Sequence, residues 1–167
     1  MKNKWEEYGK FTIKKNGTNI NGDMMHEIVE EEKLKQSETC SVYRIRIINV
    51  KLPRLLKSDS DGILAIGKTK DLNKRYGQIK TGLTKWNEHS EAILVHYVYT
   101  YSECFWRKYI STKTMAVEYY MPKNSNIDNA EAVEMISYIK EYGEPPPFNS
   151  AIPRRYDDKI WNKVFNV

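Results

Sequence analysis

The chain of 167 residues is predicted to be an α+β protein, with a small, mostly antiparallel sheet flanked by helices. Three observations favour this class. Residues 41–50 are rich in β-branched and aromatic side chains, which is typical of a strand. Residues 129–142 repeat apolar side chains at the spacing of a helix. Between them, two successive strands are separated by a polar loop, and strands joined in this way usually pair antiparallel.

The N-terminal part is expected to be an addition to the core. Residues 9–20 alternate in polarity around Asn16-Gly17, a turn signal typical of a β-hairpin. Residues 23–36 predict a helix with an acidic face, for which Asp23 is the candidate cap. The chain is therefore divided into a hairpin and helix addition, a core, and a basic aromatic appendage, at residues 1–39, 40–150 and 151–167.

The core is expected to contain three strands and two helices. The strands are predicted at residues 41–50, 62–66 and 91–101. The helices are predicted at residues 70–79 and 129–142. Asn129 is the candidate cap of the second helix, and Gly143 is expected to end it. Residues 102–121 fit either a helix or a strand, because helical and alternating spacings both occur there.

Composition and charge narrow the class of protein. The hydrophobic fraction of 40% and the charged fraction of 29% are ordinary for a globular domain, and the net charge of +5 favours a polyanionic partner. The two cysteines form no CxxC pair and the three histidines are scattered, so no zinc site or disulfide framework is expected. With no signal-peptide core and no apolar run of membrane length, we expect a cytoplasmic protein.

A cationic corner follows the second core strand. Gly67 is expected to act as a hinge there, and Thr69 is the candidate cap of the helix that follows. Lys68, Lys74 and Arg75 gather positive charge around the start of that helix. Close backbone approach, cationic side chains and a helix N-terminus together favour binding of an anionic group.

At these positions the chain resembles the GIY-YIG nuclease family. Ser41-Val42-Tyr43 corresponds to its first tripeptide and Ala65-Ile66-Gly67 to its second. Arg75 follows Gly67 by eight residues, the spacing typical of the family, and Lys68 matches a basic residue of several members. Asn149, after a run of prolines, matches the terminal asparagine of the family. The resemblance implies a metal-dependent nuclease core over roughly residues 40–150.

The chain departs from the family pattern at three points. Ala65 replaces the tyrosine of the second tripeptide, and Ser41 replaces the glycine of the first. The loop at residues 51–61 makes the gap between the tripeptides longer than usual. The lost tyrosine leaves open a catalytically inactive, nucleic-acid-binding descendant, or a stand-in role for a nearby side chain such as Tyr76, Lys68 or Tyr97.

The chemistry of phosphodiester hydrolysis agrees with the resemblance. Such a reaction needs an activated nucleophile, stabilisation of charge on the phosphoryl oxygens, and help for the leaving group. Tyr43 is expected to bind the attacking water and accept its proton, provided that cations lower its pKa. Arg75 presents a rigid fork of donors to phosphate oxygens. One carboxylate is enough for Mg²⁺, which keeps most of its waters.

Three carboxylates compete for the role of metal ligand. Glu131 borders the apolar stripe of its helix and is therefore preferred, because a ligand must reach a cleft at the edge of the core. Glu134 points further toward solvent on the same helical wheel and is the second choice. Glu118 is third, since the local structure around it is ambiguous.

The function expected from the sequence is hydrolysis of DNA by a metal-dependent endonuclease, restriction-like or associated with a mobile element. Lys70, Lys74 and Lys80 are the candidate contacts to the DNA backbone. RNA remains open as a substrate. The alternatives are the inactive binding module on the same scaffold and an unrelated tyrosine-rich interaction protein.

Overall fold

The computed structural model describes most of the chain, namely residues 4–18, 24–33, 40–84, 89, 91–95, 107–110, 114–123, 126–149, 162, 164 and 165. The strands are β1 (Glu6–Thr18), β2 (Met24–Lys33), β3 (Ser41–Ile47), β4 (Ile63–Thr69) and β5 (Thr114–Tyr120). The labelled helices are α1 (Leu72–Thr84), α3 (Arg107–Ile110) and α4 (Ile127–Tyr142). Residues 91–95 are also helical.

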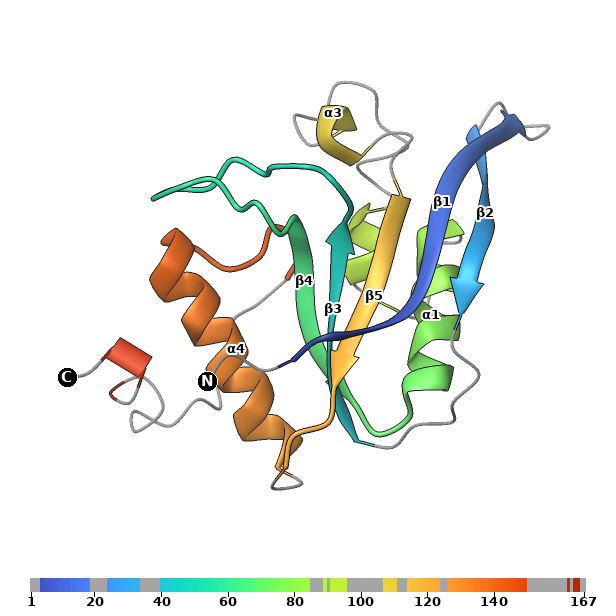
Figure 1. The fold of residues 1–167 in the computed structure, drawn as a ribbon. Coiled ribbons are helices and arrows are strands. Elements are labelled where there is room, and N and C mark those ends of the chain that lie inside the picture. The colour runs from blue at the N-terminus through green and yellow to red at the C-terminus, as the bar shows by residue number, and fades with distance from the viewer. Residues whose placement is uncertain are drawn as a thin grey trace.

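The five strands form one antiparallel sheet in the order β2-β1-β5-β3-β4, which confirms the predicted α+β class (Figure 1). The two strands that carry the motif tripeptides, β3 and β4, lie side by side at one edge. The N-terminal strand β1 lies inside the sheet, between β2 and β5. None of the described helices is both long and apolar enough to cross a membrane.

The structure corrects the expectation for the N-terminal part. The helix predicted at residues 23–36 is wrong, because β2 occupies residues 24–33 and pairs with β1, with Ile13 opposite Ile28. The turn predicted at Asn16-Gly17 is also wrong, because β1 continues to Thr18. The acidic run has good intrinsic helix propensity, but pairing with β1 from Gly9 to Thr18 outweighs that weak local preference. The last predicted residues of that helix lie outside the described range.

The strand predicted at residues 91–101 is wrong as far as the structure describes it, because residues 91–95 are helical. The amide of Ile93 donates to the carbonyl of His89 over 2.9 Å. A short continuous apolar run suits a buried strand and a buried helix equally well, so periodicity could not separate them. The central strand is β5 instead, which agrees with one of the two alternatives left open for residues 102–121.

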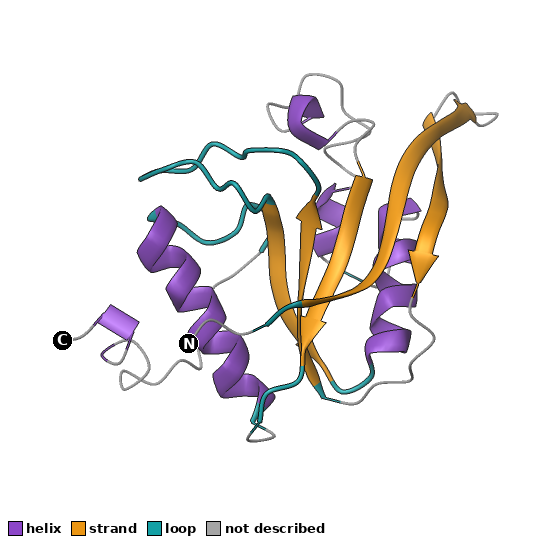
Figure 2. Ribbon diagram, in the orientation of Figure 1, coloured by secondary structure: helices purple, strands orange, loops and turns teal. Residues whose placement is uncertain are grey.

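Helices cover both faces of the sheet (Figure 2). Alternate residues of β3 point to opposite faces, with Tyr43 and Ile45 in one apolar cluster and Val42 in the other. The first cluster receives from α1 the buried side chains of Leu72, Tyr76, Ile79 and Leu83. The second receives from α4 the buried side chains of Met135, Tyr138 and Tyr142.

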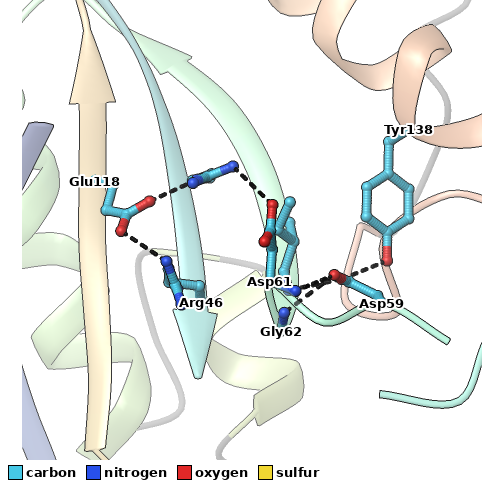
Figure 3. Close-up of polar contacts among 8 residues, drawn as sticks. Arg46, Asp59, Asp61, Gly62, Glu118 and Tyr138 are labelled. Carbon is cyan, nitrogen blue, oxygen red and sulfur yellow. Dashed lines mark hydrogen bonds and ion pairs between the residues drawn. The ribbon is translucent and has the colours of Figure 1, made fainter. Parts of the chain in front are cut away.

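The loop between β3 and β4 is held by a buried carboxylate, that of Asp59 (Figure 3). Its two oxygens accept from the amides of Asp61, Gly62 and Ile63 at 2.8–3.0 Å. The Tyr138 hydroxyl donates to the same carboxylate over 3.0 Å and so ties the loop to α4. Since four donors compensate the buried charge, the loop closes the hairpin firmly and sets the register of β3 against β4.

The helix ends differ slightly from those expected. The side chain of Asp71 accepts from the amide of Lys74 over 2.9 Å, so Asp71, and not Thr69, caps α1. The side chain of Asn126, and not Asn129, caps α4 by accepting from the amide of Asn129 over 3.0 Å. Gly143 ends α4 as predicted, in the left-handed conformation at a φ of 83°.

Candidate active site

The site is built around Tyr43 on β3. Its Cα lies opposite that of Gly67 in the β3–β4 ladder, as the two tripeptides predict. The tyrosine ring lies over the glycine, and a Cβ built at Gly67 would come within 2.6 Å of Tyr43 Cζ. Gly67 is therefore not the hinge that the sequence suggested. It lies within β4, and the absence of a side chain there makes room for the tyrosine.

Arg75 comes from the first turn of α1, the helix on the same face of the sheet as Tyr43. Burial of Leu72 and Tyr76 on either side orients that turn. The charge of Arg75 lies close enough to oppose ionisation of His89 and to favour ionisation of Tyr43. Its Nε is buried and makes no hydrogen bond within the described part of the chain.

His89 is a site residue that the sequence analysis missed. Its Nε2 lies 2.8 Å from the Tyr43 hydroxyl, and both side chains are buried. Its Nδ1 accepts from the amide of Ala92 over 3.1 Å, so the imidazole caps the helical residues 91–95. The histidines looked scattered because only the fold brings His89 to β3. The one available signal was its position three residues before the apolar run that begins at Ala92.

The electrostatic environment keeps Tyr43 and His89 neutral. Burial raises the pKa of Tyr43 strongly, and the charges of Glu91 and Glu131 raise it further, while Arg75 partly opposes them. Burial lowers the pKa of His89 to about 4, with Glu91 acting against the shift and Arg75 adding to it. Near pH 7 the pair is therefore an uncharged phenol against an uncharged imidazole.

Lys68 and Glu131 form an ion pair on the opposite face of β4. The Lys68 ammonium donates in a short hydrogen bond to the Glu131 carboxylate, and it also lies 3.0 Å from Asp128 Oδ1. Burial raises the pKa of Glu131 despite the ammonium beside it. Burial also acts to lower the pKa of Lys68, but the two carboxylates outweigh this effect and raise it. The charge of Glu131 nevertheless acts on Tyr43, where it contributes to the raised pKa of the hydroxyl.

The other two candidate carboxylates have different surroundings. Glu134 hydrogen-bonds to Tyr120 and so contributes, after burial, to raising the pKa of that tyrosine. It lines a separate cavity of about 500 Å³ between Trp5 and α4. Glu118 bridges Arg44 and Arg46 at 2.6 and 3.1 Å (Figure 3). Of the three candidate carboxylates, Glu131 is the one whose charge acts on Tyr43, although Glu91, which the sequence analysis did not consider, acts on it more strongly.

Asn149 makes the contact that the sequence predicted between the loop after α4 and the site scaffold. Its side-chain oxygen accepts from the amide of Ile66 over 3.0 Å, and its side-chain nitrogen donates to the carbonyl of Ile66 over 2.8 Å. The amide of Phe148 donates to the carbonyl of Leu64 over 2.9 Å. These bonds pair the outer edge of β4 just before Gly67 and Lys68.

The candidate DNA contacts line the surface of α1. Lys70 and Lys74 are exposed, and neither forms an ion pair with another described residue. Lys80 is half-buried, and its ammonium lies 5.6 Å from the centre of the Tyr76 ring. All three lie on, or directly before, the helix that carries Arg75.

The possible replacements for the missing motif tyrosine are separated by their surroundings. Tyr76 is buried among Tyr8, Phe11 and the backbone of Gly9, so it belongs to the core. Tyr97 lies outside the described residues. Lys68 is the candidate that lies beside Gly67 and contacts the carboxylate of Glu131.

The donor set suits a weakly coordinated cation rather than a metal enclosed by protein ligands. Within the described residues no three side chains of His, Cys, Asp or Glu gather in one place. Glu131 offers a single carboxylate with Lys68 on one of its oxygens. This set fits Mg²⁺, which uses one or two carboxylates and takes its other ligands from water and phosphate.

In comparisons with family models, with curated proteins and with solved structures, no match was found. The functional assignment therefore rests on the site geometry and on the motif resemblance.

Proposed function

We propose that the chain is a metal-dependent endonuclease of the GIY-YIG type that hydrolyses phosphodiester bonds in DNA. The observation that carries this proposal is the pairing of Tyr43 with Gly67 beside the charge of Arg75. Glu131 pairs with Lys68 on the opposite face of β4, and Asn149 pairs with the backbone of Ile66 at the edge of the same strand. Separate parts of the chain thus supply the groups that the reaction needs.

Each side chain has one role in the proposed reaction. The Tyr43 oxygen holds the attacking water. After the phenol has released its own proton to solvent, with the charge of Arg75 stabilising the phenolate, that oxygen receives the proton of the water. Arg75 binds the phosphoryl oxygens, where charge develops in the transition state. Glu131 holds Mg²⁺, which when bound supplies further stabilisation of that charge and of the leaving oxygen. Lys68 neutralises the charge of Glu131 through its ion pair with that carboxylate.

DNA is the proposed substrate, because Lys70, shortly before α1, and Lys74, next to Arg75 on α1, are both exposed. Such lysines bind the phosphate backbone without reading sequence, so binding should weaken steeply with salt. We include a reducing, cytoplasmic location in the proposal on the basis of the cysteine pattern alone.

The direct test is cleavage of supercoiled plasmid by the purified chain with Mg²⁺ and with a chelator. Cleavage is expected only with the metal. Tyr43→Phe removes the hydroxyl, keeps the ring over Gly67, and should slow the reaction by about 100-fold or more. If wild-type and Tyr43→Phe proteins are equally inactive with Mg²⁺ and Mn²⁺, the enzyme assignment is wrong.

A binding module that has lost cleavage is the second candidate. It is favoured by the burial of Tyr43, which strongly raises the pKa of the hydroxyl, and by Ala65 in place of the motif tyrosine. Such a module would bind plasmid DNA with the same salt dependence and would leave it uncut.

A further inference from the structure

A second, smaller hollow lies at the start of β1 and the end of β5, and the proposed reaction does not use it. Its volume is about 280 Å³, and its lining includes Lys4, shortly before β1, and Lys123, shortly after β5. Both lysines are exposed, and neither forms an ion pair with another described residue. The fold therefore places two cations beside the hollow without using their charges itself.

The register of the sheet aligns this hollow with the candidate active site. Gly67 pairs with Tyr43, and Tyr43 pairs with Tyr119 on the next strand. Tyr119 in turn pairs with Glu6, so one row of residues crosses β4, β3, β5 and β1. Tyr119 and Glu6 both line the hollow. Since neighbouring strands lie about 4.8 Å apart, the hollow is about 10 Å from Tyr43 across the sheet.

The charges around the hollow favour an anion. Glu6 is the one carboxylate among its described lining residues, and it accepts from the Tyr119 hydroxyl over 3.3 Å. Two ammonium groups therefore face one carboxylate. At the other end of the same row, Lys70 follows β4 directly. Positive charge thus lies on both sides of Tyr43, as an extended polyanion lying across this row would require.

We propose that the hollow between Lys4 and Lys123 binds a backbone phosphate of the DNA, about three base pairs from the bond held at Tyr43. This inference rests on the proposed function. The separation follows from the sheet, because about 10 Å corresponds to about three steps of 3.4 Å along B-DNA. A phosphate contact of this kind holds the duplex in register without reading its sequence. The two lysines therefore affect how tightly DNA binds, and the reacting groups at Tyr43 are not altered.

Fluorescence anisotropy of a short labelled duplex, in chelator and over a series of salt concentrations, tests the contact. The double variant Lys4→Ala/Lys123→Ala should lower the slope of log affinity against log salt by about one, and should weaken binding by about 10-fold at about 0.1 M salt. Thermal unfolding should be unchanged, because both side chains are exposed.

The matched control removes the same charge at the opposite end of the sheet. Lys14 lies toward the far end of β1, Lys51 follows the far end of β3, and both are exposed. The double variant Lys14→Ala/Lys51→Ala should keep the wild-type slope. An equal fall in slope for the two double variants would show that net charge alone is responsible, and would overturn the proposal.

The carboxylate of the hollow gives a test in the opposite direction. Glu6→Gln removes the negative charge and keeps an oxygen that can accept from the Tyr119 hydroxyl. DNA should bind a few-fold more tightly to this variant, because a charge that repels the phosphate is lost. Unchanged or weaker binding would contradict a phosphate in the hollow.

Neutral methylphosphonate linkages, placed one at a time in the duplex, locate the contact. The linkage that weakens binding of the wild-type chain, but not of the Lys4→Ala/Lys123→Ala variant, marks the phosphate in the hollow, and it is expected about three base pairs from the cut. If no linkage behaves in this way, the inference is wrong although the chain binds and cuts DNA. A wild-type chain that binds no DNA at low salt would overturn the proposed function and the inference together.

Discussion

Tyr43 lies directly across the β3–β4 ladder from Gly67, and its ring occupies the space where a side chain at residue 67 would be. This relationship joins the two tripeptides physically. It explains why the second one ends in glycine, and it directs the tyrosine hydroxyl toward His89 and the charge of Arg75. The catalytic proposal depends on this packing.

Gly67→Ala should therefore destabilise the fold and displace Tyr43. The added methyl group would lie 2.6 Å from Tyr43 Cζ, and relief of such overpacking typically costs about 1–3 kcal/mol. Gly77→Ala is the matched control, because nothing lies within 4 Å of its added Cβ on α1, and it should stabilise by about 0.5–1 kcal/mol. Urea unfolding of the two variants checks the contrast. Equal stability would show that the ring does not pack on Gly67.

Arg75→Ala should abolish most cleavage and leave the chain folded. A phosphate partner used in the transition state is typically worth about 100-fold or more in rate, whereas stability should change by no more than about 1 kcal/mol. Lys74→Ala, on the neighbouring exposed side chain, should instead weaken DNA binding and its salt dependence slightly. Plasmid cleavage and filter binding measure the two effects. If the Arg75→Ala variant cleaves normally, Arg75 has no role in the reaction and is an ordinary charged residue on the surface of α1.

Glu131→Gln should stop cleavage, because it preserves shape and removes the charge that binds a hard cation. DNA binding measured in chelator should persist or tighten, since a negative charge near the phosphates is lost. Glu134→Gln and Glu118→Gln should stay active if they fold, because these carboxylates contact Tyr120 and the Arg44–Arg46 pair instead. A Mg²⁺ titration of the three variants in one assay is the measurement. A dead Glu134→Gln beside an active Glu131→Gln would move the metal by about one helical turn along α4.

Asn149→Ala should loosen the edge of β4. It removes both hydrogen bonds to the backbone of Ile66, and a loss of about 1–2 kcal/mol is expected. Amide hydrogen exchange at Ile66 should be faster by about tenfold, while the amide of Phe148 should keep its bond to Leu64 and serve as the internal control. Unchanged exchange at Ile66 would mean that Asn149 does not protect this edge.

Stability should fall as the solution is acidified because of His89. Burial lowers the pKa of the folded imidazole from 6.5 to about 4, so between these values the unfolded chain binds more protons than the folded one. The free energy of unfolding should therefore fall by about 3 kcal/mol by pH 4, and no such loss is expected above about pH 6.5. His89→Asn should flatten this part of the profile in urea unfolding at pH 4.5, 5.5 and 7. If the unfolding free energies of the two proteins fall equally with pH, the His89 imidazole takes up a proton in the folded chain as it does in the unfolded one.

Sequence patterns predicted the secondary structure correctly where residues close together in the chain determine it. The β-formers of residues 41–50 predicted β3, and the helical spacing after residue 129 predicted most of α4. The spacing from Gly67 to Arg75 predicted a cation on the helix after β4, and the charge of Arg75 acts on the Tyr43 hydroxyl. A strand followed at once by a helix has few ways to fold back. Asn149 was found through motif position, and its hydrogen bonds agree with the supporting role assigned to it.

The tertiary structure decided what depends on distant partners. An acidic, helix-prone run became β2 because β1 offered a full ladder of backbone hydrogen bonds, and an apolar run after residue 90 became helical rather than extended. His89 reached Tyr43 for the same reason, since residues 46 positions apart meet only when α1 folds back over the sheet. The sequence alone determined the α+β class and the motif side chains. Packing between distant segments decided which strands pair, which carboxylate approaches the site, and which histidine binds the tyrosine.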